Sequence, residues 1–400
     1  MLEFNEYFEP NSLDTINSYA KRMNEEKQSG EVGFYHLPLE FDNLLKELKT
    51  CKKHFENKNY FIVIGVGGSS LGTKAISNFL QCENIDFLDN ISTINLNKII
   101  KKINLEKTLF ILASKSGNTV ESISYFRILV ECFNINLNDL HKYFVTICMK
   151  DTELYKFSIE NNIKNFLINS NVSGRFSVLS AIGIVPLYFA GIDVLEIMNG
   201  ARACLEDENI SEHILNLAYT LTTKMINKNY VLFTYCEELR YFNEWFVQLV
   251  AESLGKFKEY KRVGLTPISL IGSKDQHSFL QLIMEGPKDK FVQFIRIKPN
   301  NNSYKIPHLQ GFETLENISI GYTLDELLFN QAKSCLNAIV AEKIDASEIT
   351  LDEVNAYNIG YLIYYYELLV SACGLMMGIN TYNQPGVESA KIHLKMLLKK

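Results

Sequence analysis

Short runs of apolar residues alternate with longer polar segments from residue 59 onward. Buried strands of a parallel sheet are continuous apolar runs, and the polar segments between these runs are long enough for the connecting helices. The rhythm stops after four runs and restarts near residue 230. The pattern therefore predicts an α/β fold with two doubly wound parallel-sheet domains. The predicted strands lie at 59–66, 109–114, 143–149, 165–170, 230–236, 266–272 and 291–297.

Helical spacing of apolar residues dominates the ends of the chain and the segment between the two groups of strands. We expect additional N- and C-terminal helices: a helical arm over 1–57, connecting helices over 176–215 and closing helices over 351–400. The two domains would then span 58–175 and 216–350. Because no low-complexity linker separates them, they should share a cleft, where small ligands commonly bind.

The composition is typical of a globular protein and argues against nucleic-acid and metal binding. The 400 residues are 47% hydrophobic and 22% charged, enough for two buried cores. The formal net charge is -6 and the basic residues are spread along the chain, so we expect no nucleic-acid partner. The eight cysteines are far apart, and none forms the C-x-x-C pair of a zinc or redox site. We therefore expect no bound metal.

The chain shows no sign of a membrane partner. An apolar stretch at 176–192 predicts a long helix, but Pro186 would kink or break it, and the stretch is too interrupted to span a bilayer. The N-terminus is acidic and lacks the basic start and apolar core of a signal peptide. We therefore expect a cytoplasmic protein.

A glycine-rich turn, GVGGSSLG, follows the first predicted strand and opens a helix. Such a turn leaves backbone N–H groups free to face an anion. It misses the dinucleotide fingerprint because Ser70 stands at the third glycine, and it misses the Walker A motif because Lys74 comes one residue late. A phosphate site, a nucleotide site and a tight turn without a ligand all remain open.

A second loop follows the strand at 109–114. It contains Ser114, Lys115, Ser116 and Thr119, and a helix begins directly after it. Asn118 and Glu121 have the spacing of an N-cap and an N3 residue. Hydroxyls, amides and one lysine at the positive end of a helix suit a phosphomonoester. A serine-rich cap that binds only water is the alternative.

Gln248, Glu252 and Lys256 recur every four residues in WFVQLVAESLGK, so they share one face if the segment is helical. An exposed Glu–Lys ion pair is the usual meaning of this spacing. The neighbouring apolar residues favour a partly buried carboxylate instead, which could act as a base.

Three further residues are candidates for catalysis. Arg175 follows a strand-like run and a glycine, where a guanidinium could reach an oxyanion, although it could equally pair with a carboxylate. His277 stands at the start of a predicted helix, but a lone histidine is more often packed or exposed. Lys391 recurs with Lys395 and Lys399 every four residues, as on a solvated basic face.

Six segments, taken in order, resemble the glucose-6-phosphate isomerase (phosphoglucose isomerase) family. The resemblance covers the chain from about residue 60 to its end, and six ordered motifs are far more specific than any one of them. It departs from the family at Ser173, which replaces a glycine, and at Asn118, which replaces a threonine in many members. The segments are GVGGSSLG, ASKSGNTVES, SGRFSVLSAIG, QLVAESLGK, DQHSFLQ and QPGVESAK.

The resemblance implies two sugar-isomerase domains, usually assembled as a homodimer, and an enzyme of glycolysis and gluconeogenesis. It implies aldose–ketose isomerisation of glucose 6-phosphate and fructose 6-phosphate through ring opening and a cis-enediol(ate), with no metal or cofactor. By the same resemblance, Glu252 would be the base, Arg175 would stabilise the enediolate, and His277 and Lys391 would open the ring. His277 could come from the other subunit. The phosphate and substrate ligands would be Ser69, Ser114, Lys115, Ser116, Thr119, Gln248 and Gln384.

Three alternatives remain at this stage. A bifunctional glucose/mannose-6-phosphate isomerase would differ only in the stereochemistry at C2 that it accepts. A non-catalytic sugar-phosphate sensor would need a DNA-binding segment and would lack the base, whereas Glu252, His277 and Lys391 are present. The hypothesis of a nucleotide-dependent kinase or dehydrogenase rests on the two imperfect glycine motifs.

Overall fold

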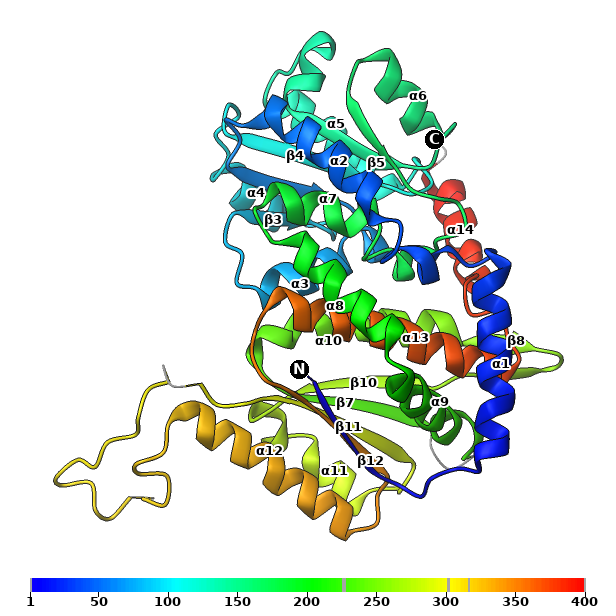
Figure 1. Cartoon of the computed structure of the whole chain (residues 1–400). Helices are drawn as coiled ribbons and strands as arrows, with labels where there is room; N and C mark the ends of the chain where they lie inside the picture. The colour runs from blue at the N-terminus through cyan, green and yellow to red at the C-terminus, as the bar shows by residue number, and fades with distance from the viewer. Residues whose placement is uncertain (1, 225–227, 301–302, 316, 399–400) are drawn as a thin grey trace.

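Two five-stranded sheets organise the chain in the computed structural model, one in each of two lobes (Figure 1). The structure describes residues 2–224, 228–300, 303–315 and 317–398. Helices cover the sheets and fill the space between the lobes (Figure 1). The predicted α/β class, with two parallel sheets flanked by helices, is confirmed.

The first sheet is parallel throughout and has the order β3-β2-β4-β5-β6. This order reverses between β2 and β4, as in doubly wound folds, which bind ligands at the carboxyl ends of the strands beside the reversal. The glycine-rich turn follows β2 and the serine-rich loop follows β4, so both lie at this point. The elements are β2 (Tyr60–Ile64), α3 (Leu71–Phe79), β3 (Ile85–Leu88), α4 (Thr93–Ile100), β4 (Thr108–Ala113), α5 (Val120–Cys132), β5 (Phe144–Cys148), α6 (Glu153–Glu160) and β6 (Lys164–Leu167).

The second sheet has the order β1-β12-β11-β7-β10. Its last four strands are parallel and reverse between β7 and β11, so this lobe repeats the topology of the first. The elements are β7 (Asn229–Tyr235), α10 (Arg240–Leu254), β10 (Thr266–Ile271), α11 (Leu280–Glu285), β11 (Lys290–Ile297), α12 (Leu324–Ala341) and β12 (Ala346–Leu351), with a hairpin of β8 (Lys256–Lys258) and β9 (Lys261–Val263).

The prediction of a wholly helical arm over 1–57 is wrong at its beginning. Residues Glu3–Tyr7 form β1, which pairs antiparallel with β12 and closes one edge of the second sheet. The partner strand lies more than 300 residues away, so a local pattern of apolar residues could not reveal the pairing. Helices α1 (Leu13–Ser29) and α2 (Phe41–Lys52) follow, as predicted for this region.

The apolar stretch at 176–192 forms a shorter helix than predicted. A 3-10 turn, η5 (Gly174–Phe176), comes first, and α7 spans only Ala181–Phe189. Pro186 lies inside α7 and cannot donate a hydrogen bond to the carbonyl of Ile182. The Thr73 hydroxyl donates to that carbonyl instead, at 3.4 Å, so the helix continues through the proline.

Helices α8 (Val194–Glu206), α9 (Glu208–Thr223) and α13 (Ala356–Met377) lie between the lobes and over the second sheet (Figure 1). All residues of α13 from Asn358 to Gly374 are buried. Among the described residues, α13 is the one helix long and apolar enough to cross a membrane, but 89% of that window is buried inside the protein. It is therefore a core helix here.

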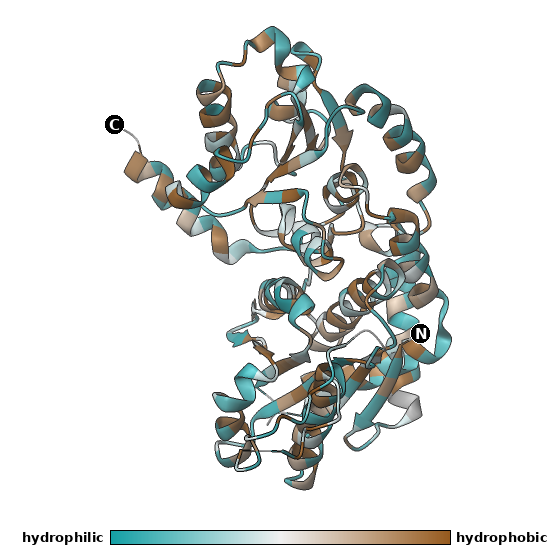
Figure 2. Ribbon diagram, turned by 90° about the vertical axis from the view of Figure 1, so that its left-hand side faces the viewer, coloured by the Kyte–Doolittle hydropathy of each residue, from teal (hydrophilic) through white to brown (hydrophobic). Residues whose placement is uncertain are grey.

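Helix α14 (Glu388–Leu398) projects from the body of the molecule near the C-terminus (Figure 2). A 3-10 turn, η8 (Pro385–Val387), precedes it. None of its described residues is buried. The helix thus presents its side chains to solvent rather than to either sheet.

Candidate active site

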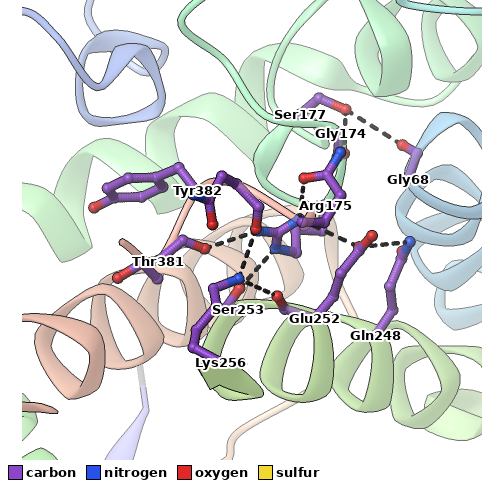
Figure 3. Close-up of polar contacts among 12 residues, drawn as sticks. Gly68, Gly174, Arg175, Ser177, Gln248, Glu252, Ser253, Lys256, Thr381 and Tyr382 are labelled. Carbon is purple, nitrogen blue, oxygen red and sulfur yellow. Dashed lines mark hydrogen bonds and ion pairs between the residues drawn. The ribbon is translucent and has the colours of Figure 1, made fainter. Parts of the chain in front are cut away.

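Four segments meet between the lobes: the turn after β2, η5, the end of α10, and the stretch 379–384 between α13 and α14 (Figure 3). The first two touch through glycines, because a Cβ on Gly68 would lie 2.3 Å from the carbonyl carbon of Gly174. The Ser177 hydroxyl also donates to the Gly68 carbonyl at 3.3 Å. This close approach brings the glycine-rich turn of the first sheet directly beside Arg175.

Arg175 is the centre of the site. Its side chain is only 1% exposed, yet it contacts five oxygen acceptors (Figure 3). Burial lowers the pKa of the guanidinium and the neighbouring Glu252 opposes that effect, but an arginine stays charged in proteins. The acceptors are Ser253 Oγ (2.8 Å), Gln384 Oε1 (3.1 Å), Thr381 O (2.8 Å), Asn383 O (2.9 Å) and Glu252 Oε2 (3.3 Å).

Glu252 lies in the last turn of α10 and contacts two other predicted site residues. Its Oε2 is 3.3 Å from Arg175 Nη1 and accepts a hydrogen bond from Gln248 Nε2, also at 3.3 Å. The side chain is 26% exposed, so a small molecule can reach it. Gln248 also faces the first lobe, since a Cβ on Gly67 would lie 3.1 Å from its Nε2.

The ordinary interpretation of this helix, an exposed Glu252–Lys256 ion pair, is wrong. Helix α10 ends at Leu254, so Lys256 lies in β8. Its ammonium group donates to the backbone carbonyls of Glu252 (2.7 Å) and Asn383 (2.6 Å) rather than to the carboxylate. Burial and the charge of Arg175 lower the pKa of Lys256 to about 8, although Glu252 raises it in part.

The serine-rich loop lies at the N-terminus of α5. Its first and last hydroxyls, on Ser114 and Thr119, hydrogen-bond each other at 2.8 Å. Lys115 donates to the Ser170 carbonyl at 2.8 Å, and burial followed by the charge of Arg175 lowers the pKa of Lys115. Ser116 Oγ accepts from the backbone N–H of residue 118 at 3.4 Å. The hydrogen bond from Lys115 to Ser170 joins this loop to the segment that leads into Arg175.

One detail of the predicted serine-rich loop is wrong. The N-cap of α5 is Thr119 rather than Asn118, and its side chain makes no capping hydrogen bond. Ser69 ends the 3-10 turn η3 (Gly67–Ser69) as a half-buried residue. Lys74, the lysine of the imperfect Walker motif, pairs with Asp89 at 2.8 Å, which weakens the nucleotide alternative.

His277 and Lys391 do not join this cluster within one chain. His277 is exposed in the 3-10 turn η7 (Lys274–His277), and its hydrogen bond is with Gln276 at 3.5 Å. Lys391 is exposed on α14 and pairs with Glu388 at 2.7 Å. Lys399, the last of the predicted basic stripe, lies outside the described residues.

Sequence reasoning missed several groups that hold Arg175. Ser253 follows Glu252 directly, so its position one residue along the helix could have indicated it. The carbonyls of Thr381 and Asn383 had no such signal, because every residue carries a carbonyl.

Among the described residues, no group of three or more His, Cys, Asp or Glu side chains could hold a metal ion. A cavity of about 890 Å³ beside α2 and β6 contains none of the site residues in its lining.

We compared the sequence and the structure with those of known proteins. A sequence model described as phosphoglucose isomerase matches residues 47–400. A curated glucose-6-phosphate isomerase from Campylobacter jejuni is 45% identical over 409 residues and covers 100% of both chains. A structure from Thermus thermophilus, described as a hypothetical protein, is 28% identical with a TM-score of 0.90, and each chain covers 100% of the other. A glucose-6-phosphate isomerase structure from Chlamydia trachomatis has a TM-score of 0.80 at 19% identity, covering 99% of this chain and 88% of its own. The chain therefore belongs to the phosphoglucose isomerase family.

Proposed function

We propose that Glu252 and Arg175 carry the central chemistry of an aldose–ketose isomerisation in the site between the lobes. As a member of its family, the chain interconverts glucose 6-phosphate and fructose 6-phosphate, a step of glycolysis and gluconeogenesis. The observation that supports these roles is the 3.3 Å contact between a reachable carboxylate and a buried guanidinium.

The reaction needs a base and a partner for the charge that forms. A proton next to the carbonyl must leave C2 and return at C1, and one carboxylate can perform both transfers. The two contacts of Glu252 with Arg175 and Gln248 involve Oε2, so Oε1 is the oxygen placed to take the proton. Negative charge develops on the oxygen atoms bonded to C1 and C2, and a fixed guanidinium stabilises it without reorganising.

The phosphate of the substrate would bind at the reversal point of the first sheet. Ser69 ends the turn after β2, and Ser114, Lys115, Ser116 and Thr119 lie in the loop after β4. These groups supply hydroxyls, backbone N–H groups and one ammonium at the N-terminus of α5. Gln248 and Gln384, which contact Glu252 and Arg175 respectively, would then bind the sugar.

We further propose that the active protein is a homodimer and that a second chain completes the site. Three surface regions carry large exposed apolar side chains, a feature of contact surfaces. These are the β8–β9 hairpin with Phe257 (68% exposed) and Tyr260 (96%), the segment 304–324 with Ile318 (85%), and α14 with Leu397 (82%). Light scattering should give the mass of two chains.

Replacement of Glu252 by glutamine tests the role of the base. The variant keeps the shape and the contact with Gln248 but cannot accept the C2 proton. We expect kcat to fall at least about a hundredfold, the lower end for acid–base groups, while fructose 6-phosphate still binds. Conversion of fructose 6-phosphate is followed with glucose-6-phosphate dehydrogenase, and exchange of the C2 proton with solvent is followed by NMR.

Glu153→Gln is the matched control, because Glu153 is an exposed helical glutamate paired with Lys156 at 3.1 Å. This variant should retain the wild-type rate. Near wild-type isomerisation by Glu252→Gln would contradict the assignment of the base.

A further inference from the structure

Residues 26–35, at the end of α1 and in the turn after it, contact both segments that hold Arg175. One contact is a network of hydroxyl groups that reaches the stretch 379–384. The other is a set of backbone and ring contacts with residues 171–176. The family match begins only at residue 47, so these residues precede the matched region.

The hydroxyl network centres on Glu26. Its Oε1 accepts hydrogen bonds from the hydroxyls of Tyr35 (2.8 Å), Ser371 (3.3 Å) and Tyr382. Ser371 also hydrogen-bonds the hydroxyls of Tyr35 and Tyr382. Burial, with Tyr35 and Glu26 close by, raises the pKa of Tyr382, so its phenol keeps the proton that it donates. The network ties α1, α13 and the stretch 379–384 together.

Tyr382 occupies the middle of the segment that contacts Arg175. Figure 3 shows its ring pointing away from Arg175, whereas the backbone on either side faces it. The carbonyls of Thr381 and Asn383 accept from Arg175 Nη2 at 2.8 and 2.9 Å. The position of the Tyr382 side chain therefore fixes two of the five acceptors of the guanidinium.

The second contact supports the segment that carries Arg175. The backbone N–H of Gly33 donates to the Asn171 carbonyl at 3.0 Å, and the Asn171 side chain donates to the Gly30 carbonyl at 3.0 Å. The ring of Phe34 packs on Phe176, the residue after Arg175, with centroids 4.8 Å apart. The same ten residues thus brace both sides of the arginine.

We propose that Glu26 and Tyr382 are positioning residues for isomerisation, and that their hydroxyl network with Tyr35 and Ser371 aims the Arg175 guanidinium at the reacting oxygen atoms. Neither residue touches the substrate in this proposal. Tyr35 and Ser371 are buried, whereas Glu26 and Tyr382 are half-buried. A hydrogen-bond network whose members are satisfied is rigid, and the loss of the Tyr382 hydroxyl would free the stretch 379–384 from it. A small displacement of a charge-stabilising group is costly for the rate. The inference rests on the proposed role of Arg175.

Tyr382→Phe tests the network directly. The variant keeps the ring that packs on Phe176 at 5.4 Å between centroids but removes the donor to Glu26. We expect kcat to fall about tenfold with KM within about twofold of wild type, because the substrate's own contacts are intact. Glu26→Ala should cause a similar loss, whereas Glu26→Gln keeps an acceptor oxygen and should recover most of the rate.

Tyr361→Phe is the matched control. Tyr361 is a buried tyrosine of α13 whose hydroxyl donates to Asp207 at 3.4 Å, away from the stretch 379–384. It should keep the wild-type kcat. If Tyr382→Phe does not fold, the comparison of Glu26→Ala with Glu26→Gln gives the same answer.

A double-mutant cycle separates this inference from the proposed function. In an Arg175→Lys background, Tyr382→Phe should lower kcat by less than about twofold, because the group that it positions is already gone. A wild-type kcat in Tyr382→Phe, or an equal loss in both backgrounds, would overturn the positioning role. A wild-type rate in Arg175→Lys alone would instead overturn the proposed function of Arg175.

Discussion

Arg175 and Lys391 are both cations of the predicted site, but the fold surrounds them very differently. Arg175 is 1% exposed and has acceptors from α10 and from the stretch 379–384. Lys391 is 60% exposed and pairs with Glu388, one helical turn away. A buried cation requires partners because it has lost water, whereas an exposed ion pair contributes little. One chain therefore preorganises Arg175, the group proposed to stabilise charge, but not His277 and Lys391, the pair expected to open the ring.

The same contrast separates Glu252 from His277. Glu252 contacts both Gln248 and the buried Arg175, and it faces the turn after β2 through Gln248. His277 is exposed in η7, three residues before α11 begins. Helix α11 lies on the opposite side of the second sheet from α10 (Figure 1). If both residues act on one substrate, the histidine has to come from another copy of the chain. In the homodimer that we propose, Glu252 and Arg175 would come from one chain and His277 from its partner.

The largest effect should follow from Arg175→Lys. A lysine keeps the charge but has no planar fork, so it cannot contact acceptors on several sides at once. We expect kcat to fall at least about a hundredfold, as for the loss of one oxyanion donor. Steady-state rates with fructose 6-phosphate measure this effect. Arg202→Lys is the control, since Arg202 donates to the Pro38 carbonyl at 2.9 Å away from the site, and it should change kcat little.

Mixed dimers test the proposal that a partner chain supplies His277 to the site. Glu252→Gln and His277→Ala should each be nearly inactive alone. When the two variants are co-expressed, half of the dimers are hybrids, and each hybrid has one site with both Glu252 and His277 intact. Activity should then recover to about a quarter of wild type, the value expected for a two-fold dimer with shared sites. No recovery in hybrids isolated by two different tags would place His277 in its own chain's site.

The titration of Lys256, which lies beside Arg175 and Glu252 in the site between the lobes, should have a smaller effect on kcat/KM. Its pKa is lowered to about 8, so the ammonium is present below this pH and is lost as the pH rises through it. The charged form donates to the carbonyls of Glu252 and Asn383. At pH 9 only about a tenth of the molecules should keep this proton, and kcat/KM should fall accordingly.

Lys256→Arg should move the fall in kcat/KM to higher pH, because a guanidinium does not titrate in this range. Lys258→Arg is the control, as Lys258 donates to the Met377 carbonyl at 2.8 Å. Its pH profile should match wild type. If the pH dependence of kcat/KM is unchanged in Lys256→Arg, another group must cause the fall at high pH.

The sequence predicted the strands whose signal is local. The seven predicted runs correspond to β2, β4, β5, β6, β7, β10 and β11. Five of these strands are apolar and almost wholly buried, whereas β6 and β10 are only partly buried. The sequence missed β1, β3, β8, β9 and β12. β12 is fully buried, but Ser347, Glu348 and Thr350 interrupt its apolar residues, so it does not read as an apolar run. β3 has four residues with Asp86 among them, and β1 has meaning only beside β12.

The predicted site shows the same limit. Arg175, Glu252, Gln248 and Gln384 are side chains with recognisable motifs, and the structure brings them into one contact network. The carbonyl acceptors and the Glu26 network were not predictable, because backbone groups have no sequence signature and hydroxyl networks form only after distant helices pack. Spacing alone also suggested an ion pair between Glu252 and Lys256, which the end of α10 at Leu254 prevents.

Ser173→Gly should have the smallest effect. Ser173 is a position where the family resemblance predicts glycine, yet its backbone is extended, with φ -73° and ψ 152°, which any residue adopts. The Ser173 hydroxyl is buried and makes no hydrogen bond, so its removal leaves no partner unsatisfied. We expect kcat within about twofold of wild type, and a loss of about 0.5 kcal/mol in the free energy of unfolding from the freer unfolded chain. Urea unfolding and steady-state rates check both, and a large loss of kcat would mean that the serine side chain itself helps to place Arg175.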